Sequence, residues 1–121
     1  MDAFCNASTG IALDGTSAYF ESKPQLPHGL YGIIIAQKAH IGKNVRIFHQ
    51  VTIGNDDRNS DNVPTIGDNV TIYPGAKIIG KVLICDRAII GANVVVNSDV
   101  HADTLVVNSQ PRILQRKLTN K

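Results

Sequence analysis

The sequence predicts an all-β fold, a three-sided parallel β-helix, and two regularities in the spacing of its small and aliphatic residues carry the prediction. A β-branched aliphatic residue recurs at every sixth position in two runs, and all but one of these residues are followed four positions later by alanine or valine. A period of six fits neither the helical period of 3.6 nor the alternation of a simple strand, and it is typical of hexapeptide β-helix repeats. The six-residue series is Ile35, Ile41, Ile47, Ile53, Ile66, Ile72, Ile78, Ile84, Ile90 and Val96, and the small residues that follow are Ala39, Val45, Val51, Val70, Ala76, Val82, Ala88, Val94 and Val100.

The coils of such a helix can bury their aliphatic side chains only against one another. Three hexapeptides make a triangular coil of about eighteen residues, and successive coils stack about 4.8 Å apart. The chain from Ile35 to Val96 supplies only about three and a half coils. Because the end coils of so short a stack leave open strand edges, we expect the chain to form an oligomer.

Composition indicates one small domain, residues 1–121, with a formal net charge of +2. The basic residues are dispersed apart from a few in the tail, which argues against a nucleic-acid partner. Cys5 and Cys85 lack a CxxC spacing and are expected to be reduced thiols of a cytoplasmic protein. No apolar run approaches the ~18 residues of a membrane span, and no signal-peptide pattern opens the chain.

Three segments are expected in order along the chain. Residues 1–32 do not keep the six-residue register and are predicted to be an irregular N-terminal segment. Residues 33–101 form the coils, with an inserted loop at 55–65 whose first eight residues include no apolar side chain. Residues 102–121 add a strand and a C-terminal tail, which is either a short amphipathic helix or a basic extension. Since loops on rigid scaffolds often carry binding residues, the inserted loop is a candidate part of a site.

Two histidines are candidate catalytic residues. His28 lies on a loop constrained by Pro27 and two glycines, just before the first coil. His49 follows the inward residue Ile47 and is expected to project from a corner or a face of the prism. For both histidines the alternative interpretation is an ordinary surface or hydrogen-bonded side chain.

Two blocks of sequence resemble the serine acetyltransferase branch of the hexapeptide-repeat acyltransferases. They are GIIIAQKAHIGKNVRIFHQVTIG at 32–54 and PTIGDNVTIYPGAKIIG at 64–80. Residues 90–96 and 106–114 also match, so that the resemblance covers about 90 residues from Pro27 to Leu114. It implies a left-handed β-helix, a homotrimer, and acetyl-CoA as a co-substrate bound in the groove between adjacent prisms.

The resemblance also implies roles for individual residues. A histidine shortly before the first block acts as general base on the acceptor hydroxyl in this family, and His28 stands near that place. A base of near-neutral pKa suits this step, because the hydroxyl must lose its proton as it attacks the thioester. Asp14 is the candidate carboxylate behind the imidazole. The positions that resemble contacts to coenzyme A are Gly54, Asn55, Gly75, Ala76 and Ala92, with Lys77 and Arg112 as candidate partners of its phosphates.

The chain departs from the family pattern at the amino-acid site. Pro27 replaces the aspartate before the catalytic histidine, and Asn62-Val63 replaces the arginine–histidine pair that holds the serine carboxylate. The chain is also similar to shorter relatives that resemble polysaccharide O-acetyltransferases. A sugar hydroxyl is therefore as good an acceptor as serine, and His49 either lines the acceptor pocket or is itself the base.

Two other functions remain open at this point. One is a non-catalytic hexapeptide scaffold. The other is a zinc enzyme resembling the γ-type carbonic anhydrases, which need three converging histidines. His40 and His49 are nine residues apart, half a coil, and should face different sides of the prism. No metal is expected.

Overall fold

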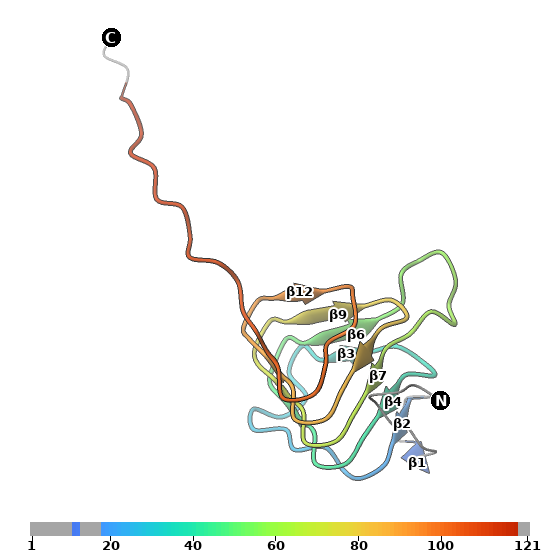
Figure 1. The fold of residues 1–121 in the computed structure, drawn as a ribbon. Coiled ribbons are helices and arrows are strands. Elements are labelled where there is room, and N and C mark those ends of the chain that lie inside the picture. The colour runs from blue at the N-terminus through green and yellow to red at the C-terminus, as the bar shows by residue number, and fades with distance from the viewer. Residues whose placement is uncertain (1–10, 13–17, 119–121) are drawn as a thin grey trace.

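Three β-sheets, parallel except for the antiparallel pair of β1 and β2, form the sides of a triangular prism in the computed structural model, which describes residues 11–12 and 18–118 (Figure 1). Sheet A contains β1 (Ile11–Ala12), β2 (Tyr19–Phe20), β4 (His40–Ile41), β7 (Thr65–Ile66) and β10 (Leu83–Ile84). Sheet B contains β5 (Arg46–Ile47), β8 (Thr71–Ile72), β11 (Ile89–Ile90) and β13 (Leu105–Val106). Sheet C contains β3 (Ile34–Ile35), β6 (Thr52–Gly54), β9 (Lys77–Ile79) and β12 (Val95–Val96). The candidate residues Cys5 and Asp14 lie outside the described residues.

The strands stack in the register that a coil of three hexapeptides requires. Leu83 of β10 pairs in parallel with Thr65 of β7, eighteen residues earlier, and Ile89 pairs in the same way with Thr71. Across the inserted loop the step is longer, because His40 pairs with Thr65. The loop therefore adds length to one coil without shifting the inward positions of the coils on either side.

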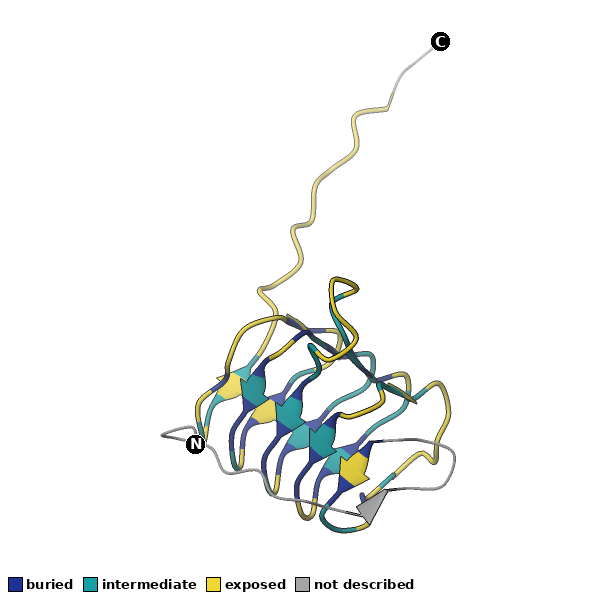
Figure 2. Cartoon of the chain, turned by 90° about the vertical axis from the view of Figure 1, so that its right-hand side faces the viewer, coloured by how far each residue is buried: buried dark blue, intermediate teal, exposed yellow. Residues whose placement is uncertain are grey.

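The six-residue series forms the core, as predicted. Nine of its ten members are buried, and Ile35 at the first strand of sheet C is half-buried. All nine of the small residues that follow them are buried as well. Figure 2 shows the buried positions recurring in register from coil to coil. The narrow interior explains the residue types, because each side of each coil admits only one inward aliphatic side chain beside a small one.

Most turns at the prism corners place a non-glycine residue at positive φ. Asparagine occupies three of these positions, at Asn44, Asn69 and Asn93, and it tolerates the left-handed region better than most residues. Between sheets A and B the corners are tied by carboxylates: Asp68 accepts a hydrogen bond from the Lys43 backbone N–H at 2.8 Å, and Asp86 accepts one from that of Asp68 at 2.8 Å. The polar residues between the repeats thus hold adjacent coils together.

Parallel pairing begins at β2, before the first six-residue repeat. Phe20 and Ala18 are buried at the end of the core, and the backbone N–H of Tyr19 donates to the Ala39 carbonyl at 2.8 Å. Gln25 forms a further parallel bridge with Arg46. The sequence does not reveal this coil, because more residues separate β2 from β4 than a regular coil contains.

The residues after β13 leave the prism as an extended segment (Figures 1 and 2). Up to Leu118 this segment contains no helix, so a short amphipathic helix does not form there. The part of the chain that the structure describes has no helix long and apolar enough to cross a membrane.

The inserted loop stands out from the corner between sheets C and A (Figure 1). One contact lies within the loop, where the Asn62 side-chain amide donates to the Asp56 carboxylate at 3.1 Å. Another joins the loop to the adjacent turn, where Lys38 forms an ion pair with Asp61 at 2.5 Å. Desolvation alone would raise the pKa of Asp56, but hydrogen bonds from Asn62 and from backbone N–H groups of the loop hold it below its usual value. The loop is therefore held in shape at its base.

Two adjacent valines test the inward and outward positions directly. Val94 is 3% exposed and Val95 is 64% exposed. Val94→Ala should lower the free energy of unfolding by about 2 kcal/mol, through lost burial and a cavity, whereas Val95→Ala should change it by less than about 1 kcal/mol. Urea unfolding at one fixed protein concentration measures both. Equal losses for the two variants would contradict the inward assignment.

Candidate active site

The two candidate histidines lie together at the corner between sheets B and C. Their ring centroids are 4.8 Å apart and their planes are inclined by 11°, so the imidazoles are stacked. His28 comes from the turn after the Gln25 bridge, and His49 comes from the turn after β5, one coil further on. The sequence presents them as alternatives, whereas the structure makes them neighbours in one site.

The turn that carries His28 is fastened to the turn that carries His49. The backbone N–H of Gln50 donates to the Tyr31 carbonyl at 2.9 Å. Gly32 has φ +66°, and a Cβ at this position would lie 2.9 Å from Cγ of Gln50. A glycine is therefore required for the loop to lie this close to the corner.

The two imidazoles differ in exposure. His28 is exposed, whereas His49 is half-buried. Nδ1 of His49 is buried and makes no hydrogen bond within the described residues. Leaving a buried polar atom unpaired costs about 1–3 kcal/mol, so this nitrogen calls for a partner beyond the residues that the structure describes.

An aromatic cluster beside the histidines is not predicted from the sequence. Phe48 lies with its centroid 5.7 Å from that of His28 and stacks on Tyr73 at 5.0 Å. The guanidinium of Arg46 lies 5.3 Å from the centre of the Phe48 ring. The sequence does contain a signal for this cluster. Phe48 and Tyr73 each directly follow a member of the six-residue series, so they occupy equivalent positions on successive coils and must stack.

Lys77 holds a positive charge at the same corner. Its ammonium donates to the carbonyl of Gly75 at 2.8 Å and lies 3.5 Å from that of Gln50. Among the described residues no carboxylate forms an ion pair with this ammonium. The arrangement fits a phosphate or other anion approaching this corner.

The small residues proposed to contact coenzyme A have different surroundings. Gly75 has φ +77°, and the place a Cβ would take is filled by the Asn93 side chain, so its small size serves the turn and the next coil. Ala76 is fully buried, and its N–H donates to the Tyr73 carbonyl, so its side chain faces the core. Ala92 is exposed at this corner, and its side chain is open to a ligand.

The remaining candidates lie elsewhere. Gly54 and Asn55 are at the opposite edge of sheet C, where the inserted loop begins, and Arg112 is exposed on the extended C-terminal segment. Asp14, the candidate carboxylate, lies outside the described residues. A single chain therefore brings together His28, His49, Lys77 and Ala92 but not the full set.

His40 lies away from this corner. It is on β4 in sheet A, where its ring stacks on Tyr19 with centroids 5.2 Å apart. Within residues 11–12 and 18–118, no group of three or more histidine, cysteine or acidic side chains is placed to hold a metal ion. The structure thus offers no observation that favours the zinc enzyme.

Comparison with known proteins gives a consistent set of similarities. A family model described as bacterial transferase hexapeptide (six repeats) matches residues 64–98. The serine acetyltransferase of Helicobacter pylori is 34% identical over 92 residues, which are 75% of this chain and 53% of that protein. Two solved structures superpose well. Serine acetyltransferase isoform 3 of Entamoeba histolytica, in complex with cysteine, has a TM-score of 0.74 and 30% sequence identity, over 84% of this chain and 36% of that chain. Soybean serine acetyltransferase complexed with serine has a TM-score of 0.72 and 35% sequence identity, over 81% of this chain and 40% of that chain. The chain spans about half the length of the Helicobacter protein and less of the other two.

These similarities confirm the predicted fold, which is all-β and a left-handed parallel β-helix.

Alanine substitutions at Gly75 and Gly54 test which of the two corners requires a glycine. Gly75→Ala forces a side chain into a left-handed turn and against Asn93, and it should destabilise the protein by at least about 1–2 kcal/mol. Gly54→Ala, whose Cβ would lie at an ordinary 3.5 Å from Ile79 and Thr52, should change stability by less than about 0.5 kcal/mol. Thermal and urea unfolding of both variants check this. A stable Gly75→Ala protein would show that the corner is open at that position.

Proposed function

We propose that the chain is an acetyltransferase that moves the acetyl group of acetyl-CoA to a hydroxyl of serine or of a sugar, because residues 64–98 match the bacterial transferase hexapeptide model and the chain is similar to serine acetyltransferases in sequence and in structure. The observation that carries this proposal is the stacked His28–His49 pair, with the cationic Lys77 at the same corner. It combines a proton acceptor with an anion-binding group, which thioester-dependent O-acylation needs. The reaction also requires a metabolite of the cell interior, which supports a cytoplasmic location.

His28 is proposed as the general base. Its exposed ring can reach an incoming acceptor, and it takes the hydroxyl proton as that oxygen attacks the thioester carbonyl. The acceptor oxygen bonds to the carbonyl carbon, and the carbonyl oxygen takes the negative charge of the tetrahedral intermediate. As the C=O bond is restored, the C–S bond breaks, and the departing thiolate of coenzyme A takes the proton from the imidazolium. His49 stacks beneath the His28 ring and fixes its orientation, and Lys77 holds a phosphate of the co-substrate.

A homotrimer is proposed to complete this site. In one chain the histidine corner and the Gly54–Asn55 edge lie on opposite sides of sheet C. Packing prisms around a common axis would bring the histidine corner of one copy toward another edge of its neighbour. The Nδ1 of His49 has no hydrogen-bond partner among the described residues, and it supports such an arrangement because a neighbouring copy is one source of that partner.

Serine and a sugar are both proposed as acceptors, because one observation favours serine and another shows no group for its carboxylate. The soybean relative was solved with serine bound. In this chain, however, Asn62 donates to Asp56 within the loop, and Val63 is half-buried against the core, so neither offers a cation to a serine carboxylate. Acceptor specificity must therefore be measured with both classes.

Three single histidine variants test the assignment of the base. Thiol release from acetyl-CoA is measured with serine and with a panel of sugars for His28→Ala, His49→Ala and His101→Ala. His28→Ala should lower kcat by about 10²–10⁴-fold, the usual contribution of a general base. His49→Ala should lower it less, and His101→Ala, which changes an exposed histidine outside the corner, should leave it unchanged.

Other outcomes reassign the roles or the function. Full turnover by His28→Ala together with an inactive His49→Ala would make His49 the base. If no hydroxyl compound is acetylated and acetyl-CoA does not raise the melting temperature of the parent, the chain is a non-catalytic scaffold.

A further inference from the structure

The histidine corner and the two sheets that meet there carry no acidic residue. The turns of this corner are residues 27–33, 48–51, 73–76 and 91–94, and neither they nor the strands of sheets B and C contain aspartate or glutamate. The acidic residues that the structure describes lie at the other two corners: Glu21, Asp68, Asp86 and Asp103 between sheets A and B, and Asp56, Asp57, Asp61 and Asp99 between sheets C and A. Arg46 and Lys77 therefore give the histidine corner a positive charge that would attract an anion.

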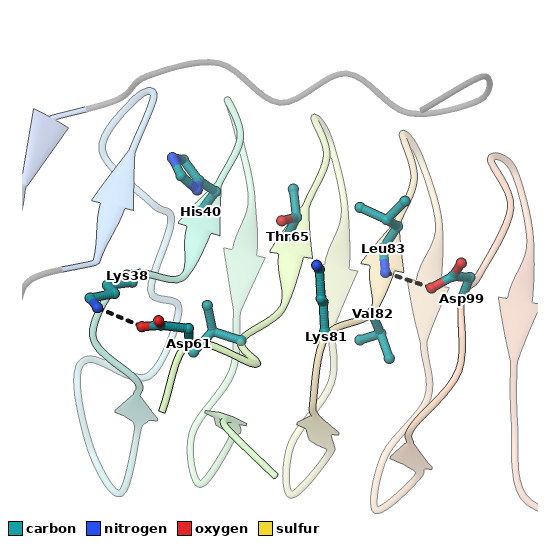
Figure 3. A pocket seen from close by; sticks show the side chains of 9 residues that line it. Lys38, His40, Asp61, Thr65, Lys81, Val82, Leu83 and Asp99 are labelled. Carbon is teal, nitrogen blue, oxygen red and sulfur yellow. Dashed lines mark hydrogen bonds and ion pairs between the residues drawn. The ribbon is translucent and has the colours of Figure 1, made fainter. Parts of the chain in front are cut away.

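The edge between sheets C and A is different, because aspartates there offset the lysines. A groove of about 660 Å³ around Lys81 runs along this edge (Figure 3). Its lining holds Lys38 and Lys81 together with Asp61 and Asp99, and Lys38 forms an ion pair with Asp61. The charges of the described residues therefore favour an anion at the histidine corner and not at this edge.

Arg46 has donors to offer at that corner. It extends from β5 on the sheet B side, is half-buried, and holds its guanidinium 5.3 Å from the centre of the Phe48 ring. Among the described residues no carboxylate forms an ion pair with it. Where the chain does supply a carboxylate, as at Arg87, Nε and Nη2 donate to the two oxygens of Asp103 at 2.7 and 3.1 Å. The Phe48 ring offers no such acceptor, so the planar fork of Arg46 remains for another carboxylate.

Phe48 brings Arg46 and His28 to one place. The His28 ring lies against the same aromatic ring, with centroids 5.7 Å apart, and Tyr73 of the next coil stacks on Phe48 at 5.0 Å. A cation and a proton acceptor thus contact one ring whose position the coils fix. A molecule that reaches both needs a hydroxyl for His28 and, a short distance from it, an anionic group for Arg46.

We propose that Arg46 binds a carboxylate of the acceptor and determines specificity, so that the acceptor is a β-hydroxy acid. In such an acid two carbon atoms separate the hydroxyl oxygen from the carboxylate carbon. Serine has this arrangement, and so does the 4-hydroxyl of a uronic acid, whereas a neutral sugar lacks the carboxylate. Lys77, on the sheet C side, is left to hold a phosphate of the co-substrate. This inference rests on the proposed acetyl transfer and narrows its acceptors.

The test is an NMR titration of the protein, with and without coenzyme A, that follows the side-chain ¹⁵Nε–H signal of Arg46. L-serine is compared with L-serinamide, and glucuronate with glucose, because the second member of each pair lacks the carboxylate. The two pairs distinguish an amino acid from a uronic acid as the source of that group. Since hydrogen bonds to charged groups are the strong ones, at least one acid should bind about 10–100-fold more tightly than its carboxylate-free partner and should move the Arg46 signal.

Matched arginine variants identify the recognising residue. Arg46→Gln should remove the preference for the acid, and Arg46→Lys, which keeps the charge but not the planar fork, should retain part of it. Arg116→Gln, at an exposed arginine on the C-terminal segment, should bind as the parent does. Unchanged melting temperatures and solution masses show that the variants fold and assemble, and the Arg46 signal of the parent does not depend on them.

Three results overturn the inference: neither acid binds more tightly than its carboxylate-free partner, the acids leave the Arg46 signal in place, or Arg46→Gln keeps the preference of the parent. Failure of the proposed reaction looks different. Carboxylate binding at Arg46 without acetylation of any hydroxyl compound would defeat the reaction and leave the carboxylate site. Acetylation of glucose as fast as of either acid would defeat this inference alone.

Discussion

The narrow interior of the prism is the constraint on which the rest of the structure depends. Each side of a coil admits one inward aliphatic side chain, and Ile66, Ile84 and their equivalents stack in parallel register at intervals of one coil. Since the interior fixes the register of the strands, it also fixes which outward-facing side chains of successive coils lie next to each other. The stacking of Phe48 on Tyr73 and the polar ties between corners follow from it.

The sequence predicts this interior almost completely, because a period of six matches neither an α-helix nor a plain alternating strand. It does not predict the corner that brings the two histidines together. His28 belongs to a segment without repeats, and only the fastening of Tyr31 and Gly32 to Gln50 shows that its ring stacks on His49. The structure gives two of the small residues a packing reason for their size: Ala76 faces the core, and the space beside Gly75 is filled by Asn93.

The outside of the prism divides its chemistry between two edges. The corner of sheets B and C carries the imidazoles and Lys77, whereas the edge of sheets C and A carries the inserted loop and the groove around Lys81. The loop can vary in length without disturbing the core, because the chain leaves after β6 and rejoins at β7 in the same inward register. Within one chain the rigid stack therefore holds the histidine corner and the inserted loop on opposite sides of sheet C.

The most direct test of the account is whether the His28–His49 corner receives coenzyme A. The measurement is the ¹⁵N spectrum of the histidine side chains during titration with coenzyme A. The account predicts that the imidazole signals of His28 and His49 shift together over one concentration range, while the signal of His101 stays in place. Binding that leaves both signals unmoved would contradict it.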